Sequence, residues 1–167
     1  MLLSDHGLSV DVGRGWDARI FRRPESAVLV PSAPGAPLGP APQSGWTEPV
    51  VHLANFGLPE ERGDYGSGAV NVMGGDHVFI ALVEFGPASA GTAMFSADGL
   101  PRLRPGELTR QSMQRPTPGM AGVQRFFHAG QRAFCLYAVI GSFSRRSVLT
   151  AVLNGALAGI TIGDRPR

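Results

Sequence analysis

Histidine and cysteine are the side chains best able to bind a metal or to transfer protons, so their spacing indicates whether such a site is present. The four histidines are His6, His52, His77 and His128, and the single cysteine is Cys135. No two of these residues stand at the short local spacing that is typical of zinc ligands. We therefore expect no metal site.

The serine and cysteine residues form no nucleophile motif. No Gly-x-Ser-x-Gly sequence occurs, and the Gly-Ser-Gly of residues 66–68 lacks its spacing. Cys135 lies between Phe134 and Leu136, where burial disfavours a thiolate even if His128 comes close. The chain has no lysine, which excludes a Walker-type phosphate loop. We predict no catalytic and no cofactor-binding residue. This pattern favours a non-catalytic protein and leaves an enzyme open as the alternative.

Glu84 stands at the end of the most hydrophobic run in the sequence. A carboxylate buried there needs a partner, and Arg125 or Arg132 could supply it. The pair would serve either as a structural ion pair or as part of an acid–base site. His52 belongs to another apolar run. We therefore name His52, Glu84 and Arg125 as candidate residues of a pocket between sheet and helix.

Four arginines fall within one short segment: Arg102, Arg104, Arg110 and Arg115. Gathered on one face they would attract anions, and otherwise they form an ordinary solvated surface. Trp46 follows a proline-rich stretch and is a candidate anchor for a protein interface, although it could equally close over the sheet. These five residues make up the predicted interaction surface.

The overall composition limits the possible partners. All fifteen basic residues are arginine, which indicates a GC-rich genome of the actinobacterial kind, and the net charge of +2 is too small to indicate nucleic acid. The chain has 167 residues, 43% of them hydrophobic, which suits a single domain over 1–167. The sequence shows no signal peptide and no apolar run that could span a bilayer. We expect a cytoplasmic protein with no membrane insertion.

Apolar periodicity predicts mostly strands. Alternation over residues 8–12 and 16–22 predicts a hairpin across the glycine turn at 13–15. Residues 77–85 and 131–140 are apolar on both parities, which is typical of central strands covered on both faces. Further strands are predicted at 50–56, 107–115, 121–129 and 159–162, and the pair 121–129 and 131–140 forms a second hairpin.

Two segments have helical signals. We predict helices over 65–73, with Ser67 as N-cap, and over 144–158, with Ser144 as N-cap. Residues 31–45 hold five prolines and form an insertion with little apolar surface of its own, and the tail over 163–167 should fray. The predicted fold class is α+β, an antiparallel β-sheet sandwiched between helices.

Four segments carry a resemblance to a known family. They are the glycine–tryptophan segment 7–16, the strand 78–85, the segment 125–137 and the helix-then-strand ending 149–162. Together they resemble small actinobacterial proteins related to PsbP and LpqN, whose fold is shared with the Ran-binding factor Mog. The resemblance covers almost the whole chain and implies a PsbP/Mog-like α/β/α sandwich with a binding or scaffolding role. The chain departs from the LpqN lipoproteins in having no export signal, no lipobox cysteine and a proline-rich insertion.

These observations predict a non-catalytic protein-interaction or adaptor domain within a larger bacterial assembly. Its partner would be a protein, not nucleic acid. The alternative is a small-molecule-binding protein or enzyme that uses a pocket between sheet and helix.

Overall fold

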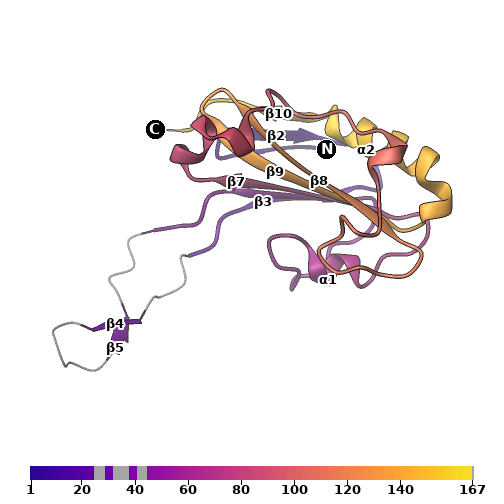
Figure 1. Cartoon of the computed structure of the whole chain (residues 1–167), viewed down its shortest axis with the longest axis horizontal. Helices are drawn as coiled ribbons and strands as arrows, with labels where there is room; N and C mark the ends of the chain where they lie inside the picture. Colours follow the sequence, from indigo (N-terminus) through magenta and orange to yellow (C-terminus); the bar gives the residue numbers. More distant parts are fainter. Residues whose placement is uncertain (25–28, 32–37, 41–44, 167) are drawn as a thin grey trace.

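A five-stranded antiparallel sheet forms the centre of the computed structural model, which describes residues 1–24, 29–31, 38–40 and 45–166 (Figure 1). Its order is β3 (Asp17–Phe21), β6 (Val50–Ala54), β7 (Val78–Phe85), β9 (Arg132–Ile140) and β8 (Ala121–Ala129). A smaller antiparallel sheet consists of β1 (Leu2–Asp5), β2 (Leu8–Asp11) and β10 (Ile160–Ile162). The fold is therefore α+β and antiparallel, as the sequence predicts.

The central strands are buried as their composition predicts. Every residue of β9 is buried, and in β7 only Val83 and Phe85 are partly exposed. Strands that are apolar on both parities can be stable only where both faces of the sheet are covered. The predicted hairpin of 121–129 with 131–140 is also confirmed, as is the closing strand predicted at 159–162, which is β10.

One face of the large sheet packs against helix α2 (Arg146–Leu157) and the smaller sheet. Leu149 and Leu153, one helical turn apart, contact a core that includes Val10 of β2 and Leu136 of β9. Asn154 extends this layer, because its side-chain amide both accepts from and donates to the backbone of Leu103, at 2.9 and 2.8 Å. The loop before β8 is thereby tied to α2.

The opposite face is covered by a short helix and loops. Helix α1 (Ser67–Val70) supplies Ala69 and Val70, which pack with Phe79 of β7 and Val139 of β9. The segment between β7 and β8 is rich in glycine and proline and contains the 3-10 turns η1 (Pro87–Gly91), η2 (Ala93–Phe95) and η3 (Pro105–Glu107). Only one helix longer than a single turn, α2, covers the large sheet within the described ranges.

The predicted first hairpin is wrong. β2 pairs with β1 and β10, whereas β3 pairs with β6, so the two predicted partners belong to different sheets. The actual hairpin turns at His6 and Gly7, whose φ angles of 51° and 72° suit a two-residue turn between twisted strands. Alternation reports which face a strand buries, but not which strand it pairs with.

Three further predictions need correction. Residues 107–115 form no strand: they contain the end of η3 and one isolated bridge from Thr109 to Gly122. Neither serine caps its helix, because α1 has Gly66 at its N-cap position and α2 has Arg145, with no side-chain capping bond at either. Residues Phe143–Arg145 form the 3-10 turn η4, which displaces the start of α2 past Ser144.

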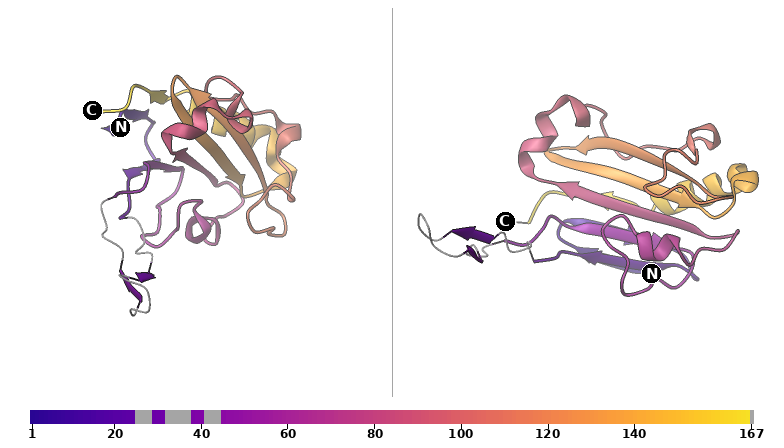
Figure 2. Two further views of the ribbon diagram at one scale, coloured as in Figure 1. Left: turned by 60° about the vertical axis from the view of Figure 1, so that its left-hand side comes forward. Right: turned by 60° about the horizontal axis from the view of Figure 1, so that its bottom comes forward.

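The proline-rich insertion at about 31–45 lies mostly outside the described residues. Its described parts, β4 (Leu29–Pro31) and β5 (Leu38–Pro40), pair with each other and with no other described strand. Figures 1 and 2 show this pair away from both sheets. At its base Pro24 and Trp46 form an isolated antiparallel bridge.

Among the described residues, no helix has both the length and the apolar character of a transmembrane span.

Candidate functional site

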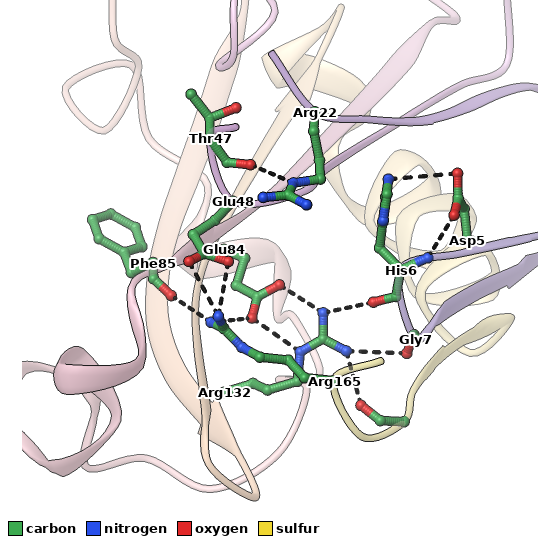
Figure 3. A network of polar contacts seen from close by, with 11 residues as sticks. Asp5, His6, Gly7, Arg22, Thr47, Glu48, Glu84, Phe85, Arg132 and Arg165 are labelled. Atoms are coloured by element: carbon green, nitrogen blue, oxygen red, sulfur yellow. Dashed lines mark hydrogen bonds and ion pairs between the residues drawn. The ribbon is translucent and has the colours of Figure 1, made fainter. Parts of the chain in front are cut away.

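Glu84 and Arg132 form a bidentate ion pair across the two central strands (Figure 3). Arg132 donates from Nε to Oε1 at 3.0 Å and from Nη2 to Oε2 at 2.6 Å, and the exposed fractions of the side chains are 4% for Arg132 and 0% for Glu84. The sequence predicts either Arg125 or Arg132 as the partner of the Glu84 carboxylate. The partner is Arg132.

The remaining donors of Arg132 bind backbone carbonyls from the smaller sheet. Nη1 donates to the oxygens of Gly7 at 3.1 Å and Gly163 at 2.8 Å, and Nη2 donates to the oxygen of His6 at 3.1 Å. All five N–H groups of the guanidinium are therefore satisfied. These three carbonyls lie at one end of the smaller sheet, where Gly163 follows β10 and pairs with Gly7, so Arg132 connects this end to the large sheet.

Arg165 completes what we call the Glu84 network, which comprises Glu48, Glu84, Arg132 and Arg165. Arg165 donates from Nη2 to Glu84 Oε1 at 2.7 Å and from Nη1 to Glu48 Oε1 at 3.1 Å (Figure 3). Two guanidinium groups balance two carboxylates. The tail that the sequence predicts to fray is instead attached to the large sheet at Arg165.

His52 is wholly buried, and both of its ring nitrogens are bonded. Nδ1 accepts a hydrogen bond from Arg62 Nε at 2.8 Å. Because a guanidinium only donates, the ring proton must be on Nε2, which donates to the backbone oxygen of Asp64 at 2.7 Å. The rings of Phe21 and Phe79 contact the imidazole edge-on. His52 is therefore a neutral histidine fixed in one tautomer.

Burial is the main reason that the pKa of His52 is lowered to about 4. The positive charges of Arg62 and Arg23 lower the pKa further, and the hydrogen bond to Asp64 opposes them. An imidazole with this pKa stays unprotonated at neutral pH. It acts here as a connector between β6 and the loop that carries Arg62 and Asp64.

The three predicted pocket residues do not come together. Through the strand register, His52 shares a face with Tyr137, whereas Glu84 and Arg125 lie on the face towards α2. Arg125 forms an ion pair with Glu107 near the surface. No single pocket in the described structure contains all three residues.

A pocket of about 280 Å³ lies on the face of the sheet opposite α2. We call it the tyrosine pocket; it is lined by Gly63, Asp64, Tyr65, Ser67, Val70, Asn71, Gln114, Arg115, Thr117 and Tyr137. The rings of Tyr65 and Tyr137 meet edge-to-face with centroids 6.0 Å apart. An aromatic floor with a polar rim is the usual composition of a small-ligand site.

The loop that carries Tyr65 depends on glycines that permit close approach. A Cβ at Gly66, where φ is +71°, would lie 2.1 Å from the ring of Phe79. A Cβ at Gly68 would lie 2.0 Å from the backbone oxygen of Glu61. The glycines that resemble a catalytic or phosphate motif in the sequence thus serve packing, which brings Tyr65 down onto the sheet.

The ionisable groups of the pocket floor are protonated at neutral pH. Burial raises the pKa of Tyr65 to about 12, with further contributions from neighbouring Cys135 and Asp64. Burial also raises the pKa of Tyr137 and of Cys135. These groups can donate hydrogen bonds, but they are poor bases and Cys135 is a poor nucleophile.

Comparison with known proteins gives no relative from which a ligand could be transferred. No protein-family model, curated protein or solved structure matches this chain. The resemblance to the PsbP and LpqN group therefore stays a prediction. The class of ligand that the tyrosine pocket binds therefore follows only from the residues that line it.

Two arginines of the predicted interaction surface, Arg102 and Arg115, border different pockets. Arg102, Arg104, Arg110 and Arg115 are all exposed. Arg115 borders the tyrosine pocket, whereas Arg102 borders a separate hollow beside Asn154 and Leu157 of α2, on the other side of the sheet. These two arginines therefore face different surroundings.

Trp46 is 58% exposed at the base of the β4–β5 pair. Its backbone is held in place, because Arg22 donates from Nη2 to the oxygen of Trp46 at 3.1 Å. The tryptophan ring thus does not close over the sheet, and it is available at the surface. Within the described ranges, no three histidine, cysteine or acidic residues lie close enough to hold a metal ion.

Sequence reasoning missed the tyrosine pocket. Tyr137 lies inside an apolar run that predicts only a central strand, and Tyr65 begins a segment predicted as helix. The two tyrosines come from distant parts of the chain. The usable signal was the concentration of glycines around Tyr65, which indicates a loop that must approach other backbone closely.

Proposed function

We propose that this chain is a non-catalytic protein-interaction or adaptor domain, cytoplasmic, within a larger bacterial assembly. The proposal rests on the observation that the buried side chains of His52 and Arg132 use all of their hydrogen-bonding groups within the protein. His52 has both nitrogens bonded, and Arg132 uses every donor on Glu84 and the smaller sheet.

Such saturation argues against acid–base catalysis at these positions. A general acid or base must reach the substrate and must change protonation state at working pH. His52 reaches no solvent, and its pKa is lowered to about 4, mainly by burial. The role of these groups is to hold the two sheets and the 62–64 loop in place.

Trp46 supports a protein partner. Large aromatic side chains dominate the binding energy of many interfaces, because they bury much area at a small cost in conformational entropy. Trp46 presents such a side chain next to the projecting β4–β5 pair, on a backbone fixed by Arg22. We therefore propose the base of this pair as the contact region.

The test is co-purification of the tagged chain from its native host under gentle conditions. Trp46→Ala should abolish recovery of the partner. Met94→Ala is the matched control, because Met94 is 60% exposed but lies in η2, a different segment of the chain. Equal recovery with both variants, or a monomer without any partner, would count against the proposal.

A second candidate function, binding of a small molecule, is favoured by the tyrosine pocket. The floor of this pocket is aromatic, its rim is polar and it is open to solvent. This candidate does not depend on Trp46, and either function can hold without the other.

We propose that the chain is a PsbP/LpqN-like protein with a Mog-like α/β/α sandwich. The support is the set of segments 7–16, 78–85, 125–137 and 149–162, together with the antiparallel sheet and its final helix and strand.

A further inference from the structure

We propose that the tyrosine pocket binds a small organic monocarboxylate, with the carboxylate on Arg115 and an acceptor oxygen on the hydroxyl of Tyr137. This inference rests on the second candidate function, small-molecule binding, and not on the protein-interaction proposal.

The size of the pocket restricts the ligand. Its volume of about 280 Å³ is at the lower end of ligand pockets, which span roughly 300–1,000 Å³. The apolar part of the lining comes from the rings of Tyr65 and Tyr137 and from Val70. A compact ligand with one apolar or aromatic portion fits this lining.

Tyr137 supplies a donor that the described chain does not use. Its hydroxyl oxygen accepts a hydrogen bond from the backbone N–H of Gln114 at 2.9 Å, and the residue is 1% exposed. Among the described residues its hydroxyl hydrogen has no acceptor. A buried donor without a partner is unfavourable, and an oxygen of a ligand would satisfy it.

The charge at the rim favours an anion. Asp64 also lines the pocket: its Oδ2 forms an ion pair with Arg23, which neutralises its charge, whereas its Oδ1 is buried and has no hydrogen-bond partner among the described residues. Arg115 is exposed and forms no ion pair within the described part of the chain. Its guanidinium can bind a carboxylate through two parallel hydrogen bonds.

A carboxylate fits this rim better than a phosphate does. Arg115 is the only cationic side chain in the described lining. The polar groups beside it, such as Ser67, Asn71 and Thr117, are neutral. One cation neutralises a monoanion, whereas a phosphate dianion usually needs several donors with positive charge.

The experiment compares acids with their neutral amides. Benzoate with benzamide, phenylacetate with phenylacetamide, and hexanoate with hexanamide are titrated into the full chain, with inorganic phosphate as a further probe. Binding is measured from backbone amide chemical shifts. We expect at least one acid to bind, its amide to bind about tenfold more weakly, and phosphate not to shift the pocket residues.

Two variants and one control test the assignment of the groups. Arg115→Gln should weaken binding of the acid about tenfold, and Tyr137→Phe, which removes only the hydroxyl, should weaken it severalfold. Arg110→Gln should leave it unchanged, because Arg110 is an exposed arginine of the same segment that does not line the pocket. Retained amide shifts elsewhere in the spectrum verify that each variant folds.

The possible results distinguish a failure of the carboxylate assignment from a failure of small-molecule binding itself. Equal binding of acid and amide, or no effect of Arg115→Gln, would overturn the carboxylate assignment but keep a small-molecule site. Phosphate binding in preference to the acids would likewise overturn it. Failure of every acid, every amide and phosphate to shift the pocket residues would overturn both.

Discussion

Arg132 of β9 and Glu84 of β7 share two hydrogen bonds, at 3.0 and 2.6 Å, in an almost completely buried position. The same guanidinium reaches the turn between β1 and β2 and the end of β10. Relative to solvent, burying this pair is costly, so its contribution depends on all of its partners being present. It joins the two sheets through polar contacts, in addition to the apolar core that they share.

Replacing Arg132 with Met should therefore strongly destabilise the fold. The substitution leaves Glu84 buried with only Arg165, and it removes the guanidinium donor from the oxygens of His6, Gly7 and Gly163, of which only that of Gly7 keeps a backbone donor, the N–H of Gly163. We expect a loss of about 3–5 kcal/mol in the free energy of unfolding, measured by urea denaturation. Arg125→Met is the control: its surface pair with Glu107 should contribute at most about 1 kcal/mol. Similar losses in the two variants would contradict this account.

Arg165 should hold the C-terminal segment against the large sheet. Arg165→Gln removes the bonds to Glu48 and Glu84 while Arg132 still neutralises Glu84. We expect a loss of about 1 kcal/mol in the free energy of unfolding and faster amide hydrogen exchange over 163–165. Arg14→Gln, a change at an exposed arginine in a turn, should alter neither quantity. Unchanged exchange in Arg165→Gln would mean that the tail is held by other contacts.

The sequence predicts those parts of the fold whose signals are local. The runs at 77–85 and 131–140 must be covered on both faces whatever their partners, and both are central strands. The partner of strand 8–12 could not be read in this way. Two short glycine turns, at residues 6–7 and 13–15, were available, and only the backbone geometry at His6 and Gly7 distinguishes them.

The candidate sites, too, could be predicted from the sequence only where the signal is local. Glu84 could be recognised because a charge inside an apolar run requires a counter-charge, and Arg132 was one of two named partners. The tyrosine pocket could not be recognised, because Tyr65 and Tyr137 each suit an ordinary apolar environment. The rings of the two tyrosines meet only because β7 pairs with β9 and because the 63–68 loop packs closely onto the sheet.

The close packing of the 63–68 loop against Phe79 can be tested by comparing alanine substitutions at Gly66 and Gly130. Both have positive φ, 71° and 58°, but only at Gly66 would a Cβ meet a ring, that of Phe79. Gly130→Ala should lose about 1–2 kcal/mol from backbone strain alone. Gly66→Ala should lose about 1–3 kcal/mol more, because Phe79 or the loop must move. Thermal unfolding measures both losses, and equal values would show that the loop does not pack as described.

His52 should make stability depend on pH over a defined range. The pKa of His52 is lowered from 6.5 in the unfolded chain to about 4 in the fold, mainly by burial. Between these values the unfolded state binds one proton more than the folded state does. Stability is therefore complete above pH 6.5 and falls as the pH is lowered towards 4, by about 1.4 kcal/mol per unit and roughly 3 kcal/mol in all.

His52→Gln isolates this contribution. The glutamine amide can accept from Arg62 and donate to the oxygen of Asp64 as the imidazole does, but it does not titrate. Unfolding free energies of both proteins are measured by urea denaturation from pH 7 to pH 4.5. We expect their difference to narrow steadily below pH 6.5, because only the wild-type chain loses stability through His52. A constant difference over this range would show that the pKa of His52 is the same in the folded and unfolded chains, and the lowering of this pKa by burial would then be wrong.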